Sequence, residues 1–404
     1  MVVAATGLMV IAAVLVSLPV MLFVFEIGAA IFLPKRSPRS PEEAFLPARI
    51  AVLVPAHNEG VGLRATLEDI AGQLRPGCRM VVIADNCSDD TAAIARGLGA
   101  EVVERHDPTN RGKAYALDYG LQHLRGDPPE IVVIVDADCR LEPETIECLA
   151  TACMTTGRPA QALDLMTAPE RSAINHQVAE FAWRIKNWVR PMGLAALGLP
   201  CQLMGTGMAF PWELIASSDL GGAHLAEDLQ LGLGLAAMGS PPIFCPSAVV
   251  TSQFPTSVEG GDTQRRRWEY GHIQTIISAA PRYFVLALRR RRLGLLALTL
   301  DLIVPPLSLL ALLIVAMTLV TGAAAAFGLA PAAFVVSLAN LVASILAAIL
   351  CWLYCGRELL PLRSLPLVAA YVGAKLRLYL AFLFGRGVTS WVRTDRGPPA
   401  TTRD

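Results

Sequence analysis

The sequence predicts an α/β domain with a mainly parallel sheet, flanked by transmembrane helices. Short, near-continuous apolar runs alternate with segments of helical periodicity in the middle of the chain, which is typical of a parallel sheet covered on both faces. Long apolar stretches with almost no charge lie on either side of that region. Polar clusters follow the apolar runs, at the carboxyl ends of strands, where such sheets bind ligands.

The apolar stretches lie at 1–33, 293–320 and 323–355. Of the 404 residues, 54% are hydrophobic and 17% are charged, and the apolar ones are clustered. Glu26 is the charged residue of the first stretch, Asp301 is that of the second, and the third has none. Each stretch supplies the roughly 20 apolar residues that span a bilayer. The first lacks the basic start of a signal peptide and is too long for one, so we interpret it as a retained anchor.

Basic residues at both ends of the middle segment predict its orientation. They follow the first apolar stretch and precede the second: Lys35, Arg36, Arg39, Arg49 and the run from Arg289 to Arg292. Because cytoplasmic segments carry an excess of Lys and Arg, we expect residues 34–292 to form one cytoplasmic domain. The third stretch then returns the chain to the cytoplasm near Arg357.

The segment 356–404 is expected to stay at the cytoplasmic face. Residues 361–384 are long enough to cross a bilayer, but Lys375 and Arg377 fall near their middle, where charge is costly. Crossing would also place an arginine-rich tail outside, against the positive-inside bias. We therefore predict an interfacial or re-entrant segment followed by a cytoplasmic tail. That prediction gives three spans, with four spans as the alternative.

Charge and cysteine content disfavour several classes of protein. The formal net charge is zero, so nothing in the bulk composition indicates a nucleic-acid partner. The nine cysteines form no CxxC pair and no His/Cys pattern typical of a metal site. An odd number of cysteines in a cytoplasmic domain indicates reduced thiols and not a disulfide framework.

The middle segment is long enough for one α/β domain and shows a repeated strand-then-helix pattern. Apolar runs predict strands at 50–54, 80–84, 101–104 and 131–135. Segments of helical periodicity lie between these runs, at 65–74, 90–98 and 114–124. Polar clusters close three of the runs, beginning at His57, Asp85 and Asp136, and predict a ligand site at one edge of the sheet.

Asp136 and Asp138 close the last of these runs. Alternate residues of an extended strand share a face, so both carboxylates can point into one cleft. Mg²⁺ prefers oxygen ligands and often combines one or two carboxylates with substrate phosphates. The pair therefore predicts a site for Mg²⁺ or Mn²⁺ on a diphosphate. A turn or a helix cap is the alternative reading of the same pair.

Two nearby features suit a nucleotide. Asp85 can accept hydrogen bonds from a base or a ribose, while Asp89 or Asp90 caps the helix that follows. Arg111 and Lys113 flank a glycine at the start of the next predicted helix, an arrangement that favours phosphate binding. Solvated loop charge is the alternative for the two basic residues.

Glu227 and Asp228 lie at the start of the predicted helix 225–238. Acidic side chains there can cap the helix, which is the structural interpretation. The chemical interpretation is that one carboxylate takes the proton from an acceptor hydroxyl as a general base.

The segment from Gln264 to Trp268 joins a hydrogen-bonding amide, basic side chains and a flat apolar ring. Arg267 can stabilise the charge that develops on a departing diphosphate, and the Trp268 ring can stack on a sugar. A basic interfacial helix on anionic lipid is the alternative, and Arg265 and Arg266 are assigned to that role.

Taken in order, these residues resemble the family 2 glycosyltransferases, in particular the membrane-embedded group that includes cellulose, chitin and hyaluronan synthases. The resemblance covers roughly residues 50–275 and extends to the flanking apolar segments. The matched segments are Val54 to Glu59, Asp85 with Ser88 to Thr91, Asn110 to Ala114, Asp136 to Asp138, Gly205 to Gly207, Glu227 with Asp228, Gln264 to Trp268, and Trp391 to Arg396 in the tail.

The resemblance implies a GT-A fold and an inverting transfer of a sugar from a nucleotide-sugar, expected to be a UDP-sugar, with Mg²⁺ or Mn²⁺ as cofactor. It implies Asp228 as the general base and Asp138, with Asp136, as the metal ligand. It implies that the donor is bound by Pro55, Asn58, Glu59, Asp85, Lys113 and Asp136. The acceptor and the departing diphosphate are assigned to Gly205, Thr206, Glu227, Gln264, Arg267 and Trp268.

Two departures from the family pattern leave the acceptor open. Ala226 stands where many synthases have Thr, although Glu227 and Asp228 remain. The few apolar stretches disfavour a channel made by the chain itself, so addition to a lipid or a short glycan is as credible as polymer synthesis. Expected partners are a glycan or lipid acceptor, membrane lipids and secretion or assembly proteins. A non-catalytic assembly partner and a transporter are the other classes considered.

Overall fold

The computed structural model describes residues 2–34, 49–169, 174–218, 220 and 226–384. Its strands form an 8-stranded sheet in the order β3-β2-β1-β4-β7-β6-β8-β5. The strands are β1 (Ile50–Ala56), β2 (Arg79–Asp85), β3 (Glu101–Arg105), β4 (Ile131–Ile134), β5 (Arg140–Leu141), β6 (Ala160–Thr167), β7 (Met208–Pro211) and β8 (Ile243–Gln253).

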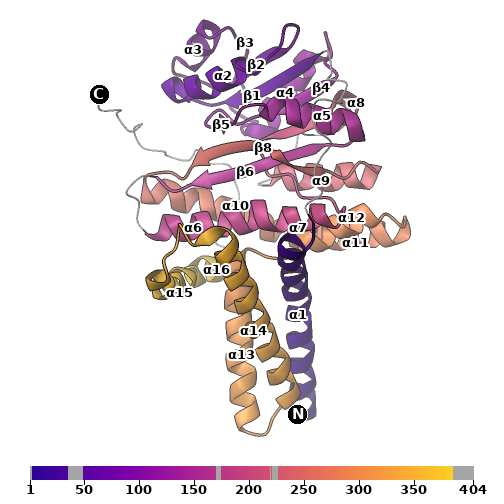
Figure 1. The fold of residues 1–404 in the computed structure, drawn as a ribbon, viewed down its shortest axis with the longest axis vertical. Coiled ribbons are helices and arrows are strands. Elements are labelled where there is room, and N and C mark those ends of the chain that lie inside the picture. Colours follow the sequence, from indigo (N-terminus) through magenta and orange to yellow (C-terminus); the bar gives the residue numbers. More distant parts are fainter. Residues whose placement is uncertain (1, 35–48, 170–173, 219, 221–225, 385–404) are drawn as a thin grey trace.

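The sheet is mixed, and the predicted parallel arrangement describes its first half. Strands β3, β2, β1 and β4 run parallel to their neighbours. Strand β7 is antiparallel to both β4 and β6, β6 and β8 are parallel, and β5 is antiparallel to β8. The reversal at β7 joins the first half of the sheet to the half that lies nearer the long apolar helices (Figure 1).

Helices cover both faces of the first half of the sheet. One face packs on α2 (Leu63–Ala71), which follows the short 3-10 turn η2 (Gly60–Gly62), and on α3 (Thr91–Gly97) and α5 (Thr145–Thr156). The opposite face packs on α4 (Lys113–Leu124), α8 (Trp212–Ala216) and α9 (Glu227–Met238). Every residue of β4 is buried, which explains its uninterrupted apolar sequence.

A layer of helices separates the sheet from the long apolar helices (Figure 1). This layer contains α6 (Ile174–Arg184), which continues through a π-helical turn, η3 (Ile185–Val189), into α7 (Arg190–Ala196). It also contains α10 (Val258–Ser278), α11 (Ala280–Arg289) and α12 (Leu293–Leu302). Strands β6 and β8 contribute Leu163 and Phe244 to the apolar cluster that η3 shares with the first apolar helix.

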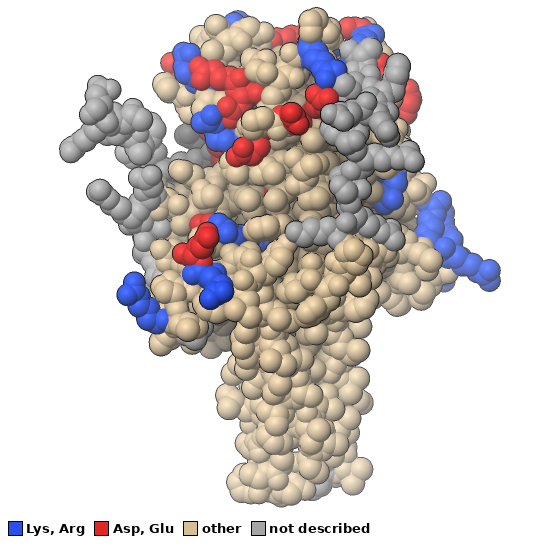
Figure 2. All heavy atoms as spheres, in the orientation of Figure 1, with Lys and Arg blue, Asp and Glu red and all other residues tan. Residues whose placement is uncertain are grey.

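The long apolar helices are α1 (Val2–Phe32), α13 (Leu307–Ala326) and α14 (Pro331–Cys351), which continues into the π-helical turn η4 (Trp352–Gly356). They project together from one side of the domain (Figure 1), and this projection carries almost no charge on the face shown in Figure 2. Within the described chain, four segments are long and apolar enough to cross a membrane: Val3–Phe32, Leu307–Ala326, Pro331–Gly356 and Leu362–Leu383.

The predicted boundary at 293 needs correction. Residues Leu293–Leu302 form the separate helix α12, which packs on α9 and α11 and not along α13. The break follows from Pro305 and Pro306, and α12 is held in the domain because Asp301 pairs with Arg190 of α7. The apolar segment that could cross therefore starts at Leu307.

The last apolar segment is not one continuous helix. The 3-10 turn η5 (Leu362–Ser364) precedes α15 (Leu365–Ala374) and α16 (Leu376–Leu383), which meet at Lys375. The Lys375 ammonium pairs with Glu269 of α10 at 2.6 Å. The number of membrane crossings and the cytoplasmic orientation remain predictions. The tail motif from Trp391 to Arg396 lies outside the described residues.

Candidate active site

A cleft of about 580 Å³ opens where strands β1, β2 and β4 end. Segments far apart in the sequence meet there, as the sequence predicts for the carboxyl edge of a parallel sheet. All but one of the predicted site residues line this cleft: Pro55, Glu59, Asp85, Lys113, Asp136, Asp138, Gly205, Thr206, Glu227, Asp228, Gln264, Arg267 and Trp268.

Asn58 is the predicted donor ligand that does not line the cleft. Its backbone is left-handed, with φ of 54°, and its Oδ1 accepts a hydrogen bond of 2.7 Å from the Ser88 amide. Asn tolerates this conformation better than most residues. The observed geometry therefore gives Asn58 a structural task, which is to join the loop after β1 to the loop after β2.

Asp85 is a buried carboxylate held by Arg105 of β3. The Arg105 Nη1 lies 2.6 Å from Asp85 Oδ1, and its Nη2 donates to Asp107 at 3.0 Å and to the Asn110 carbonyl at 2.8 Å. The guanidinium thus links the end of β2 to the loop that leads into α4. Asp85 is presented to the cleft in one orientation, which suits recognition of a ribose or a base. The neighbouring Asp89 accepts from the Thr91 amide at 3.1 Å just before α3, whereas Asp90, the N-cap residue of α3, makes no capping bond with its side chain.

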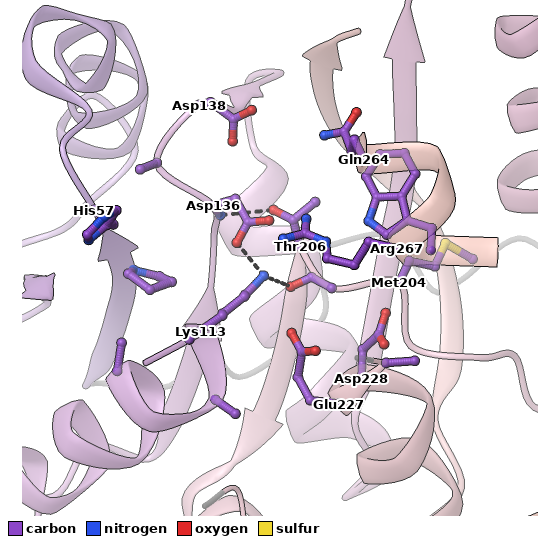
Figure 3. A pocket seen from close by; sticks show the side chains of 18 of the residues that line it. His57, Lys113, Asp136, Asp138, Met204, Thr206, Glu227, Asp228, Gln264 and Arg267 are labelled. Atoms are coloured by element: carbon purple, nitrogen blue, oxygen red, sulfur yellow. Dashed lines mark hydrogen bonds and ion pairs between the residues drawn. The ribbon is translucent and has the colours of Figure 1, made fainter. Parts of the chain in front are cut away.

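Lys113, at the start of α4, joins two separate parts of the cleft (Figure 3). Its ammonium forms an ion pair with Asp136 and donates to the Gly205 carbonyl at 2.7 Å. Burial lowers the pKa of Lys113, but the charges of Asp136 and Glu227 outweigh it and the pKa is raised. Lys113 therefore stays protonated and can contact a phosphate at this point of the cleft.

Hydrogen bonds hold the loop from Met204 to Gly207 against the segment Asp136 to Asp138. Thr206 Oγ1 accepts from the Asp136 amide at 3.0 Å. Gln161, a buried residue of β6 that the sequence analysis did not single out, donates to the Thr206 carbonyl at 2.9 Å and accepts from the Met204 amide at 2.8 Å. Gly205 has φ of 97°, a conformation that favours glycine. These bonds fix the Gly205 carbonyl that faces Lys113.

Asp136 and Asp138 both line the cleft, on the loop that follows β4 (Figure 3). Among the described residues, no group of three His, Cys, Asp or Glu side chains is placed to hold a metal by itself. Two carboxylates plus the oxygens of a bound diphosphate are nevertheless the usual ligand set of Mg²⁺. The donor chemistry of this loop therefore fits a hard divalent cation.

Glu227 and Asp228 are the first two residues of α9 and lie on the other side of the Lys113 ammonium from Asp136 (Figure 3). Burial, and then the charge of Asp228, raises the pKa of Glu227 to about 7. Burial also raises the pKa of Asp228. Two effects lower it in part: the Leu229 amide donates to Asp228 Oδ1 at 2.8 Å, and Lys186 and Lys113 carry positive charge. A raised pKa in a cleft is the property expected of a general base.

Helix α10 brings Gln264, Arg267 and Trp268 to the cleft, as the sequence spacing predicts. Arg265 pairs with Asp262 at 2.7 Å, and neither Arg265 nor Arg266 lines the cleft. Of the three arginines in this run, Arg267 is the one that reaches the cleft, and the lipid-facing role of the other two stays a prediction.

The cleft is also lined by residues without a role predicted from the sequence, among them Asp164, Trp183, Lys186 and His272. Asp164 interrupts the apolar run of β6, which is the signal that could have identified it. Trp183 lies on α6 and Lys186 on η3, where side chains of this kind are usually structural. Burial lowers the pKa of His272 to about 3, so it is neutral. Its Nε2 lies 3.0 Å from the Leu302 carbonyl.

Comparison with known proteins connects this geometry to a class of enzymes. Residues 47–271 match the family described as glycosyltransferase like family 2. The chain is 26% identical over 259 residues to the probable glycosyltransferase YdaM of Bacillus subtilis, covering 60% of this chain and 59% of that protein. It is 35% identical over 100 residues to the 4,4'-diaponeurosporenoate glycosyltransferase of Staphylococcus haemolyticus, covering 24% of this chain and 25% of that protein.

The matched regions thus span 59% or less of the length of these two relatives. Among solved structures, a mannosyltransferase from Pyrobaculum calidifontis, in complex with GDP-Man and Mn²⁺, superposes with a TM-score of 0.53 at 19% identity. The superposition covers 94% of this chain and 99% of that one. This likeness establishes the GT-A fold.

The fold and the matched domain define the class, a GT-A domain joined to helices apolar enough to cross a membrane. The chain belongs to glycosyltransferase family 2.

Proposed function

We propose that the protein is an integral-membrane, inverting glycosyltransferase that moves a sugar from a nucleotide-sugar to a glycan or lipid acceptor. The observation that carries the proposal is the meeting of Asp85, Lys113, Asp136, Asp228 and Arg267, from five segments, in one cleft. We further propose that the domain of residues 34–292 is cytoplasmic, since basic residues flank it at both ends. A uridine nucleotide is the first donor to test.

The donor is proposed to bind along the edge of β1, β2 and β4. Asp85 would hold the nucleoside, and Pro55 and Glu59 would line the same end of the cleft. Lys113 and Arg267 would contact the diphosphate, with charge-assisted hydrogen bonds to its oxygens. Asp138 and Asp136 would hold Mg²⁺ or Mn²⁺, which neutralises charge on the departing diphosphate. The Mn²⁺ in the complex of the Pyrobaculum mannosyltransferase agrees with this choice.

The chemical step needs a base on the acceptor side. An acceptor hydroxyl would attack the anomeric carbon, the bond from that carbon to the diphosphate oxygen would break, and the hydroxyl proton would pass to Asp228. The raised pKa of Asp228 fits its proposed role as the proton acceptor. Arg267 would stabilise the negative charge that forms on the nucleoside diphosphate. One displacement without a covalent intermediate inverts the anomeric configuration.

Transfer of one sugar to a membrane amphiphile is the second candidate, beside polymer synthesis of the cellulose, chitin or hyaluronan synthase type. Two observations favour it. The cleft is floored by residues of η3 and α10, in the layer next to the apolar helices (Figure 1). One relative is named a 4,4'-diaponeurosporenoate glycosyltransferase. Analysis of product length by mass spectrometry separates single transfer from polymer synthesis.

The test uses the full-length protein in nanodiscs with labelled UDP-glucose, UDP-N-acetylglucosamine and GDP-mannose, and a lipid extract as acceptor source. We expect one donor to label the lipid or polymer fraction, and Asp228→Asn to abolish the labelling. The matched control is Asp118→Asn, because Asp118 bonds to Gln122 on α4 at 2.7 Å and does not line the cleft. Labelling by Asp228→Asn at the wild-type rate would show that Asp228 is not the base.

A further inference from the structure

Four buried side-chain oxygens next to the catalytic cleft have no hydrogen-bond donor within the described chain. They are Asp164 Oδ1, Asn187 Oδ1, Gln202 Oε1 and Gln264 Oε1. Asp164 and Gln264 line the cleft itself. Asn187 and Gln202 line a small cavity that continues from its floor and shares Lys186, Met204, Leu229 and His272 with it.

Each of these four atoms lacks a hydrogen-bond donor among the described residues. Each is a hydrogen-bond acceptor, and a buried acceptor without a donor costs free energy unless the contents of the cavity supply one. Asp164 is the strongest case, because its side chain is 2% exposed and its Oδ2 already accepts from the Asn187 amide at 2.9 Å. Phosphate and carboxylate groups carry no donor when ionised, whereas hydroxyl groups do.

An aromatic wall stands beside these acceptors. The rings of Trp183 and Trp268 are 4.9 Å apart between centroids and inclined by 45°. Trp183 is anchored by its Nε1, which donates to the Asp164 carbonyl at 3.1 Å. Both rings line the cleft, so their apolar faces lie close to the buried oxygens that lack a hydrogen-bond donor in the described chain. Flat apolar rings with nearby polar atoms suit a sugar ring, which has one face of C–H bonds and a rim of hydroxyls.

Lys186 completes this group of residues. Its ammonium lies 5.3 Å from the centre of the Trp183 ring, its side chain is open to the cleft, and it forms no ion pair with the described residues. An ammonium donates three hydrogen bonds, so it can bind the oxygen of a hydroxyl that in turn donates to a carboxylate. The carboxyl groups of Asp228 and Asp164 stabilise the positive charge of the Lys186 ammonium, so this cation is already partly balanced by the protein.

The location of these residues indicates where the ligand comes from. The small cavity extends to Arg190, whose guanidinium bonds to Glu26 of α1 and to Asp301 of α12, each at 2.5 Å. Since α1 is one of the helices apolar enough to cross a membrane, this end of the cleft is its membrane side. The nucleotide end, at Asp85, belongs to the opposite half of the sheet.

We propose that Asp164, Trp183, Lys186 and Gln264 form an acceptor subsite for a hydroxyl-rich group, a sugar or polyol, that enters from the membrane side. The subsite does not suit a phosphate or carboxylate head group. This inference rests on the proposed glycosyl transfer, and it narrows the acceptor to compounds whose reacting end is polyhydroxylated. Asp164 and Lys186 would hold hydroxyls beside the one that Asp228 deprotonates.

The test measures binding of short amphiphiles that share one chain and differ in the head group. Hexyl β-glucoside, hexyl phosphate and hexanoate are added to the full-length protein in nanodiscs, and binding is followed by saturation-transfer NMR. We expect saturable binding of the glucoside alone. Asp164→Leu and Trp183→Phe should each weaken it by about tenfold or more. Asp164→Asn keeps an acceptor oxygen and should retain most of the binding.

Trp188→Phe is the matched control, since Trp188 lies on the same helical segment but packs on Tyr354 with a centroid distance of 5.7 Å and does not line the cleft. Binding of UDP-sugar or GDP-sugar, measured in the same samples, reports that each variant is folded. Hexyl phosphate binding as tightly as the glucoside, or glucoside binding unchanged in Asp164→Leu, would overturn the proposal. Failure of every nucleotide-sugar to bind the wild type would instead overturn the proposed function.

Discussion

Gly193 of α7 packs so closely on Glu26 of α1 that a β carbon at position 193 would overlap the Glu26 carbonyl oxygen and lie 3.2 Å from the Ala30 nitrogen. We therefore expect Gly193→Ala to separate the two helices and to lower stability by about 1–3 kcal/mol. Thermal unfolding in detergent measures the effect. Gly28→Ala, also on α1, is the control, because nothing lies within 4 Å of that position. Equal melting temperatures for the two variants would contradict the expectation.

Arg190 joins two acidic side chains from other helices in a buried cluster. Replacing it by Met leaves Glu26 and Asp301 without their cation, which typically costs about 3–5 kcal/mol. We expect Arg190→Met to give little folded protein in a detergent-solubility assay. The triple variant with Glu26→Gln and Asp301→Asn should recover much of the yield, because no unpaired charge then remains. A triple variant no better than the single one would argue against the ionic explanation.

Lys113 holds Asp136 and the Gly205 carbonyl at the same time. Loss of its ammonium in Lys113→Met should free the loop that carries Gly205 and weaken binding of the donor diphosphate. We expect kcat/KM for the nucleotide-sugar to fall by roughly a hundredfold, in line with the loss of one charge-assisted contact. Lys113→Arg, which keeps the charge, should lose less. Steady-state kinetics that show equal losses for Met and Arg would indicate a requirement for shape and not for charge.

The activity is expected to fall at acid pH because Asp228 must be ionised to accept a proton. Its pKa is raised by burial and held down in part by the charge of Lys186. Lys186→Met removes that cation, so the pKa of Asp228 rises further and the acid limb of the kcat/KM profile moves to higher pH. Lys186→Arg should keep the limb in place. A limb that moves to lower pH in Lys186→Met would show that another group controls it.

The carboxylates of Asp136 and Asp138 are expected to make the reaction dependent on a divalent cation. Treatment with EDTA should stop transfer, and Mg²⁺ or Mn²⁺ should restore it. Asp138→Asn removes one oxygen charge from the ligand set and should raise the metal concentration for half-maximal rate by roughly tenfold or more. Isothermal titration of Mn²⁺ with the donor present gives an independent measure. Full activity in EDTA would exclude the metal role.

Strands β1, β2 and β4 in the first half of the sheet were predictable because they are buried on both faces and therefore read as apolar runs. The second half was not. Strand β7 has only four residues, and β8 mixes Pro246, Ser247 and Thr251 with apolar positions. Their pairing with β4 and β6 depends on contacts far apart in the sequence, which local patterns do not carry.

The same reasoning explains the site. Asp85, Asp136 and Asp138 were found because polar residues directly after buried strands mark an edge of a sheet. Asp164 and Lys186 sit inside a strand and a helix, where only the folded chain shows that they face the cleft. Asn58 is the opposite case. It belongs to a matched motif, but its side chain accepts a hydrogen bond from the Ser88 amide and joins two loops beside the cleft.

The pairing of Glu26 with Arg190 also has a consequence for biosynthesis. The two residues are 164 positions apart, and Asp301 comes later still. Because a chain is made from its N-terminus, the proposed topology has α1 enter the membrane while the carboxyl group of Glu26 has no partner. We expect its final depth and rotation to be set only after translation has passed α12, so that a stalled or truncated chain leaves α1 misplaced and open to quality-control proteolysis.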